Sequence, residues 1–151
     1  MSDQAQHRQP RGVPSGGQFS TVARTEPAVE LADQPTRTVD DDGTERWLLD
    51  GVLHRVDGPA AVWPDGRQEW RVNGLLHRVD GPAITTADGT LMWCANDLVH
   101  RSGGPAITFS DGAETWYRRG RPHRVDGPAR TWADGTEEWW IDGERTDPPD
   151  A

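Results

Sequence analysis

The 151-residue sequence has no lysine, a single cysteine and no long apolar run. Because Cys94 stands alone, no disulfide can form within the chain, and nothing indicates an oxidising compartment. Without a run of about 18 apolar residues the chain offers no candidate membrane-spanning helix. We therefore predict a cytoplasmic protein that does not insert into a membrane. Arginine supplies all sixteen of the Lys/Arg positions, which fits a GC-rich coding sequence.

The formal charge of −9 is unevenly distributed along the chain. In residues 1–38 four arginines balance four carboxylates, so the acidic excess lies downstream. An acidic surface repels nucleic-acid phosphates and anionic membranes, and it attracts basic partners. We expect a protein partner, of basic character, and no direct binding to nucleic acid.

Hydrophobic residues are scarce, at 33% of the sequence, and Trp dominates the aromatic ones with eight copies against one Tyr and two Phe. Each Trp side chain can bury about 150–250 Å². A thin core built mainly from these rings is therefore expected.

A 23-residue period organises the chain from residue 42 onward without insertion or deletion. An Asp-Gly pair recurs at each step, beginning with Asp42-Gly43, and so does a Gly-Pro-Ala segment, beginning with Gly58. Two single residues recur with the same step and are interpreted as structural repeat positions: Trp47, Trp70, Trp93, Trp116 and Trp139, and His54, His77, His100 and His123. Such a period indicates a repeat architecture.

Each unit is typical of a β-hairpin. Trp70 and Val72 alternate with polar neighbours, as in a half-buried strand. The segment 82–86 is rich in β-formers and leads to Asp88-Gly89, which we interpret as a type I′ turn. The other end turns through Asn73-Gly74 and a longer loop. No segment of this region has a helical period, so the prediction is an all-β fold: a single-layer antiparallel meander ribbon of hairpin repeats.

The period also defines the domain organisation. Residues 1–30 have the composition of a disordered N-terminal arm. The repeat domain spans 31–145 and is followed by a tail at 146–151. It divides into a degenerate half-repeat at 31–41, full repeats at 42–64, 65–87, 88–110 and 111–133, and a terminal half-repeat at 134–145.

The period, the Asn-Gly turn followed by His, and the placement of Gly and aromatic residues resemble MORN repeats. The similarity is closer to a divergent bacterial MORN-variant type found in proteins labelled as antitoxins, and it covers about residues 31–145. Trp stands where Tyr is common in that family, and His-Arg-x-Asp-Gly-Pro replaces His-Gly-x-Gly. The resemblance implies a curved ribbon used in protein association, dimerisation or lipid contact, and it implies no catalysis.

A second, shorter resemblance lies near the N-terminus. The segment Arg11–Phe19, RGVPSGGQF, is similar to a tag-like segment in actinobacterial and actinobacteriophage proteins. Together with the exclusive use of Arg, it favours an actinobacterial or bacteriophage source.

The recurrent His and Asp residues invite a chemical interpretation, but their spacing opposes one. Equivalent positions in successive hairpins lie two strand spacings apart, roughly 10 Å, whereas donors to one zinc ion lie within about 4 Å of each other. His77 is instead predicted to pack on a Trp, with Asp80 accepting backbone N–H groups. Cys94 is expected on the face opposite Trp93, where it can be exposed, as an incidental thiol. No nucleophile, metalloprotease or phosphate-loop motif is present, so no catalytic residue, metal or cofactor is predicted.

Functional residues are sought where the repeats differ. Trp63, Phe109 and Trp132 occupy a position that has Thr86 in the second repeat, and a second variable position follows each recurrent Trp. The candidate partner-binding residues are Trp63, Arg71, Phe109, Tyr117, Trp132 and Trp140.

Two hypotheses for function follow. The first is a non-catalytic scaffold or protein-binding module, in a specific version an antitoxin, immunity or phage anti-defence protein that occludes a basic partner. The alternative is a structural or self-assembling component, such as part of a phage particle, because unpaired edge strands permit homo-oligomer growth.

Overall fold

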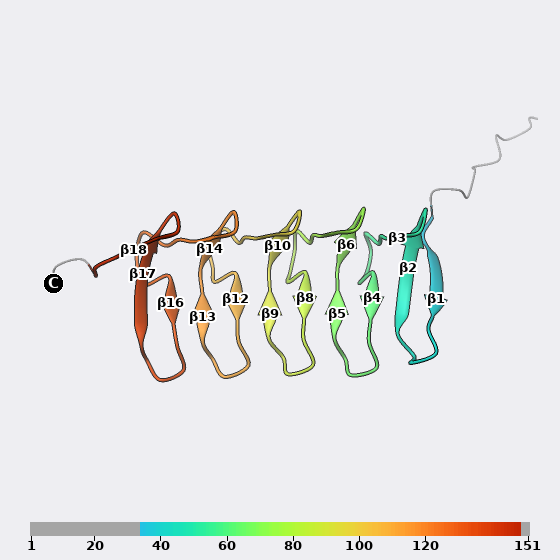
Figure 1. The fold of residues 1–151 in the computed structure, drawn as a ribbon, viewed down its shortest axis with the longest axis horizontal. Coiled ribbons are helices and arrows are strands. Elements are labelled where there is room, and N and C mark those ends of the chain that lie inside the picture. The colour runs from blue at the N-terminus through green and yellow to red at the C-terminus, as the bar shows by residue number, and fades with distance from the viewer. Residues whose placement is uncertain (1–33, 149–151) are drawn as a thin grey trace, which may run out of the picture. The chain divides into compact units, whose positions relative to one another are not determined.

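The computed structural model describes residues 34–148, which form eighteen short strands and no helix (Figure 1). No helix that could cross a membrane occurs in this part of the chain. The predicted arm at 1–30 and the segment Arg11–Phe19 lie outside the described residues.

The main sheet is an antiparallel meander of twelve strands, which confirms the predicted all-β class (Figure 1). Its strands follow the order of the chain, and each strand between β1 and β18 along this path pairs with the strand on either side. They are β1 (Thr36–Val39), β2 (Glu45–Leu49), β4 (Ala61–Val62), β5 (Gln68–Glu69), β8 (Ile84–Thr85), β9 (Leu91–Met92), β12 (Ile107–Thr108), β13 (Glu114–Thr115), β16 (Arg130–Thr131), β17 (Glu137–Ile141) and β18 (Glu144–Thr146), with β3 (Val52–Leu53) paired to β2.

Three separate two-stranded hairpins accompany this sheet. They are β6 (Arg71–Val72) with β7 (Leu75–Leu76), β10 (Cys94–Ala95) with β11 (Leu98–Val99), and β14 (Tyr117–Arg118) with β15 (Arg121–Pro122). Three of the four full repeats therefore contain four short strands, and the repeat at 42–64 contains three, rather than the two arms expected from the sequence.

The recurrent Trp marks the point where the chain passes from the main sheet into a hairpin. The N–H of Trp70 donates to the carbonyl of Ala83 at 2.7 Å, and its own carbonyl accepts from the N–H of His77 at 3.0 Å. The N–H of Ala83 donates to the carbonyl of Met92 at 2.8 Å, so it does not continue the pairing with Trp70. The residues that follow Trp70, in β6, therefore pair with β7 of the same hairpin rather than with the main sheet.

One of the two turns of each repeat differs from the prediction, and the other occurs where it was expected, at Asn73-Gly74. Asn73 and Gly74 have φ values of 51° and 81°, the signature of a type I′ turn. At the Asp-Gly end only the glycine has a positive φ, as in Gly66 at 90°. Prediction of a type I′ turn at Asp-Gly was wrong because the Asp side chain accepts the N–H two residues on, at 2.9 Å from Asp65 to Arg67, which favours a three-residue loop.

Burial is divided between small and large residues. The Ala of each Gly-Pro-Ala segment is fully buried, whereas the recurrent Trp rings are half-buried. A guanidinium covers four of the five rings, a role that we predicted for His77. The Arg that follows each His lies over the ring centroid at these distances: Arg55 over Trp47 4.2 Å, Arg78 over Trp70 3.8 Å, Arg101 over Trp93 3.9 Å and Arg124 over Trp116 4.1 Å.

The glycine of Gly-Pro-Ala is explained by the same stack. A Cβ added at Gly81 would lie 2.7 Å from Cζ of Arg78, so any side chain would displace the guanidinium from Trp70. Arg78 also donates to the carbonyl of Pro82 at 3.2 Å. Each guanidinium is thus held between a Trp ring and a glycine, and such a contact contributes about 0.5–2 kcal/mol.

The recurrent His residues join successive hairpins. Nδ1 of His54 lies 2.8 Å from Oδ1 of Asn73 and accepts the N–H of that residue at 3.2 Å. His123 accepts the N–H of Asp142 in the same way at 3.0 Å. Each of these His residues therefore braces the type I′ turn of the following unit. Within residues 34–148 no group of three His, Cys, Asp or Glu is placed to hold a metal ion.

Candidate functional site

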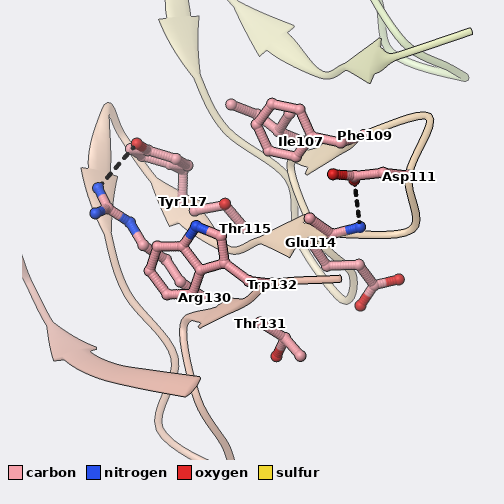
Figure 2. A pocket seen from close by; sticks show the side chains of 10 residues that line it. Ile107, Phe109, Asp111, Glu114, Thr115, Tyr117, Arg130, Thr131 and Trp132 are labelled. Atoms are coloured by element: carbon pink, nitrogen blue, oxygen red, sulfur yellow. Dashed lines mark hydrogen bonds between the residues drawn. The ribbon is translucent and has the colours of Figure 1, made fainter. Parts of the chain in front are cut away.

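A groove lies on one face of the main sheet, where strands β12, β13 and β16 run side by side (Figure 2). Its volume is about 420 Å³, within the range of small ligand or side-chain pockets. We call it the aromatic groove and define it by its lining residues: Ile107, Phe109, Asp111, Ala113, Glu114, Thr115, Tyr117, Arg130, Thr131 and Trp132.

The strand register places most of this lining on one face. Ile107 pairs with Thr115, and Thr115 with Arg130, so these three side chains point the same way. Phe109 and Trp132 lie two residues beyond Ile107 and Arg130 and therefore share their side of the sheet. The floor is buried, with Ile107 and Thr115 each 8% exposed, while the Phe109 and Trp132 walls are 41% and 40% exposed.

The groove is open because a small residue separates its walls. The N–H of Phe109 donates to the carbonyl of Ala113 at 2.9 Å, and Ala113 continues the strand that lies between Phe109 and Trp132. Its equivalent 46 positions earlier is Arg67, whose guanidinium lies 4.4 Å from the ring centroid of Trp63. A long side chain fills that position beside Trp63, whereas the methyl group of Ala113 leaves it empty beside Phe109, the equivalent of Trp63.

A polar network closes one end of the groove (Figure 2). Nη2 of Arg130 donates to the hydroxyl of Tyr117 at 3.4 Å, and Nη1 lies 3.5 Å from Oε2 of Glu138. Trp140 donates through Nε1 to the same Glu138 oxygen at 2.9 Å, and its ring lies under Arg130 at 5.0 Å. Trp140 therefore lies beside the groove on the adjacent strand β17, on the same face as Arg130, and helps to hold Arg130 in place.

The opposite end of the groove is acidic. In Figure 2 Asp111 and Glu114 lie away from Tyr117, and Asp111 accepts the N–H of Ala113 at 2.9 Å. The site thus offers two exposed aromatic walls, a phenol and guanidinium at one end and carboxylates at the other. Such a lining suits an apolar side chain whose flanking atoms carry positive charge.

Two of the candidate residues, Trp63 and Arg71, lie in another part of the same face. They flank Glu69, which is only 4% exposed and accepts from Nε of Arg71 at 2.8 Å and from Nη2 of Arg67. Arg71 also donates to the carbonyl of Gly74 at 2.6 Å. Intramolecular contacts thus already engage Arg71, and the ring of Trp63 is covered by Arg67.

Cys94 is buried, with 2% of its surface exposed, so the expectation of an exposed thiol was wrong. It lies two residues beyond Met92, whose strand partners are Ile84 and Ile107, so apolar residues lead up to it. Burial raises the pKa of the thiol to about 11. A thiol in that state is a poor nucleophile at neutral pH.

The structure thus brings Phe109, Tyr117 and Trp132 together and places Trp140 beside them. Sequence reasoning missed Ala113 and Arg130, which shape the floor and one end of the groove. A signal was present, because Ala113 is the smallest residue at a position otherwise occupied by Thr44, Arg67, Thr90 and Thr136.

Comparison with protein-family models and with curated protein sequences returned no match to this chain. The resemblance to MORN repeats therefore stays a prediction.

Proposed function

We propose that this chain is a non-catalytic protein-binding module whose aromatic groove receives an apolar side chain of a partner. One observation carries the proposal: Phe109 and Trp132 expose large rings on either side of a buried floor. The other Trp rings of this sheet are covered by a guanidinium at four of five repeat positions and at Trp63. Uncovered aromatic rings that line a hollow are the typical anchor points of a protein interface.

The charge of the chain favours a basic partner. Asp111 and Glu114 line one end of the groove, and the chain as a whole carries −9. Long-range attraction of this kind raises the association rate of an oppositely charged protein. An antitoxin, immunity or phage anti-defence protein that occludes a basic, nucleic-acid-handling partner is the version of this function that fits best. The resemblance to antitoxin-labelled MORN variants agrees with it.

The test closes the groove with a residue that the repeat already accommodates. In A113R the new side chain takes the place that Arg67 has beside Trp63, so it should stack on an aromatic wall and change stability by less than about 1 kcal/mol. We expect at least a tenfold loss of partner capture from host lysate, measured by pull-down with quantitative mass spectrometry.

V79S is the matched control, because Val79 is 80% exposed on a loop outside the groove and its equivalent in the next repeat is Ser102. It should capture the same partner as the wild type. Equal capture by A113R and the wild type would refute the groove as the binding site, and the lack of any enriched partner would refute the binding function.

The alternative, a self-assembling component, rests on the two edges of the sheet. Among residues 34–148, strands β1 and β18 each have a neighbour on one side only, and all their residues are exposed. Exposed edge strands can pair with another copy of the chain. Size-exclusion chromatography with light scattering separates the two functions, since a mass that rises with concentration favours assembly and a constant monomer opposes it.

A further inference from the structure

A second hollow, of about 750 Å³, lies at the hairpin formed by β14 and β15. It shares no lining residue with the aromatic groove. Its lining is His100, Ser102, Arg118, Arg119, Arg121 and Asp142. Three of these six side chains are guanidinium groups, in a protein whose net charge is strongly negative.

The repeat provides an internal reference for this hollow, and it shows that the arginines are exceptional. No other unit has a cation at any of the three positions. The equivalents of Arg118 are Leu49, Val72, Ala95 and Ile141; those of Arg119 are Asp50, Asn73, Asn96 and Asp142; those of Arg121 are Val52, Leu75, Leu98 and Glu144.

The loop that faces this hairpin also differs from its equivalents in the other units, and the difference again removes negative charge. Three units carry a Val-Asp pair after His-Arg, and the remaining one carries Ser102-Gly103. Where the Asp is present it can pair with the preceding Arg, as Asp57 does with Arg55 at 3.0 Å. Removing this carboxylate beside the hollow, and adding a hydroxyl at Ser102, makes the hollow more favourable for an anion.

These arginines are unfavourable for the stability of the hairpin when no anion is bound. Arg118 and Arg121 are direct cross-strand partners, and like charges in such a pair are destabilising. Arg119 has a φ of 52°, in the left-handed region where Asn, Asp and Gly are the favoured residues. Side chains and backbone held at a local cost in this way mark functional positions.

Charge in the hollow is only partly neutralised. Nη2 of Arg118 lies 2.7 Å from Oδ1 of Asp142, and this contact lowers the pKa of that carboxyl. Within residues 34–148 neither Arg119 nor Arg121 has a carboxylate within ion-pair distance. The stem of Arg121 rests against Gly143, where a Cβ would lie 3.5 Å from Cδ of Arg121. Three guanidiniums against one carboxylate leave an excess of two positive charges.

We propose that this hollow is a binding site for a phosphate monoester. Such a group carries a charge of about −1.5 to −2 at neutral pH and three acceptor oxygens, which matches the excess charge of the hollow. Guanidinium forks of Arg119 and Arg121 can each donate two parallel hydrogen bonds to phosphate oxygens. The hydroxyl of Ser102 supplies a further donor.

The test replaces the three arginines of the hairpin with the residues found at the equivalent positions of the preceding unit. In R118A/R119N/R121L the hairpin carries the residues found at Ala95, Asn96 and Leu98, and both the like-charge pair and the unfavourable Arg backbone are removed. We expect this variant to be at least as stable as the wild type. Titration calorimetry with sodium phosphate, against sodium chloride at matched ionic strength, should show binding to the wild type and at least a tenfold weaker affinity in the variant.

R145N is the control for loss of a cation, because Arg145 is exposed and lies outside the hollow. It should bind phosphate as the wild type does. Binding of phenyl phosphate is then compared with binding of a phosphoserine peptide, and the same peptide with unmodified serine is the control. This comparison identifies which kind of phosphate monoester the hollow prefers. Tighter binding of the phosphopeptide supports a phosphorylated side chain, and equal binding supports a free phosphate monoester.

The proposal is overturned if the triple variant binds phosphate as the wild type does, or if the wild type gives no signal beyond chloride. Its outcome is independent of the aromatic groove, since A113R leaves every residue of this hollow in place.

Discussion

Two aromatic rows of the same sheet differ in how they are used. The first, the Trp ladder, comprises Trp47, Trp70, Trp93, Trp116 and Trp139; the second, the turn row, comprises Trp63, Thr86, Phe109 and Trp132. The ladder never varies, and in four units an Arg and a Gly hold its ring in the same way.

The turn row changes from unit to unit. It is closed by a guanidinium at Trp63, polar around Thr86, and open as the aromatic groove between Phe109 and Trp132. Because the ladder already supplies the packing, the turn row is free to vary without loss of the fold. The ladder is therefore expected to carry more of the stability than the turn row, and three measurements test that difference.

The largest effect is expected from removing a ladder ring. W93A deletes a half-buried ring together with its contact to Arg101, and should lower the free energy of unfolding by about 3 kcal/mol. W132A removes a ring that is 40% exposed and should cost less than about 1 kcal/mol. Urea unfolding followed by circular dichroism measures both, and similar losses in the two variants would contradict the division of roles.

A smaller, pH-dependent effect is expected from the polar part of the turn row. Hydroxyl groups of Thr86, Thr90 and Ser110 donate to Asp88 and hold the pKa of its carboxyl at about 2, below the usual 3.8. Since the folded-state pKa is lowered, this stabilisation is present above pH 3.8 and is lost as the pH falls toward 2. The difference in Tm between the wild type and D88N should therefore shrink over that interval in thermal melts.

D111N is the matched control for this measurement, because Asp111 occupies the equivalent turn beside Phe109 and Ala113 and, among the described residues, accepts only a backbone N–H. A Tm difference for D88N that stays constant from pH 5 to pH 2 would show that the hydroxyl cluster does not act through the carboxylate.

The smallest effect is expected at Cys94. A thiol with 2% exposure and a pKa of about 11 should react with a soluble thiol reagent at pH 8 only when the chain opens. Labelling followed by absorbance should be slow in buffer and fast in urea. Rapid labelling of the native protein would mean that the sheet around Met92 opens more readily than the ladder implies.

The fold class was predictable because the period fixes the position of every strand and turn residue. The passage of the chain from the main sheet into a hairpin at Trp70 was not predictable, because it depends on the N–H of Ala83 donating to Met92 rather than to Trp70. The turn type at Asp-Gly was not predictable, because Asp-Gly also favours a type I′ turn, and only the folded loop shows the Asp65 carboxylate accepting the N–H of Arg67.

The candidate residues were predictable only in part. Variation between repeats indicated Phe109, Tyr117 and Trp132, which the structure gathers in one groove. The same variation also marks Ala113, but its importance was missed, since a groove depends on what is absent between two rings as much as on the rings. The role of Arg78 was also missed, because the stack on Trp70 forms only after the chain has folded back beside Gly81.

The pairing scheme of the main sheet has a consequence for how the chain reaches this structure. Each strand pairs with partners close in sequence, as Glu69 does with Ala61 and Ile84. Contacts of such low sequence separation allow fast folding, and in repeat proteins folding can begin in any unit and spread to its neighbours. A 23-residue unit can therefore be added or deleted by recombination without disturbing the strand pairing of the other units. The length of this sheet is thus open to evolutionary adjustment while its register is preserved.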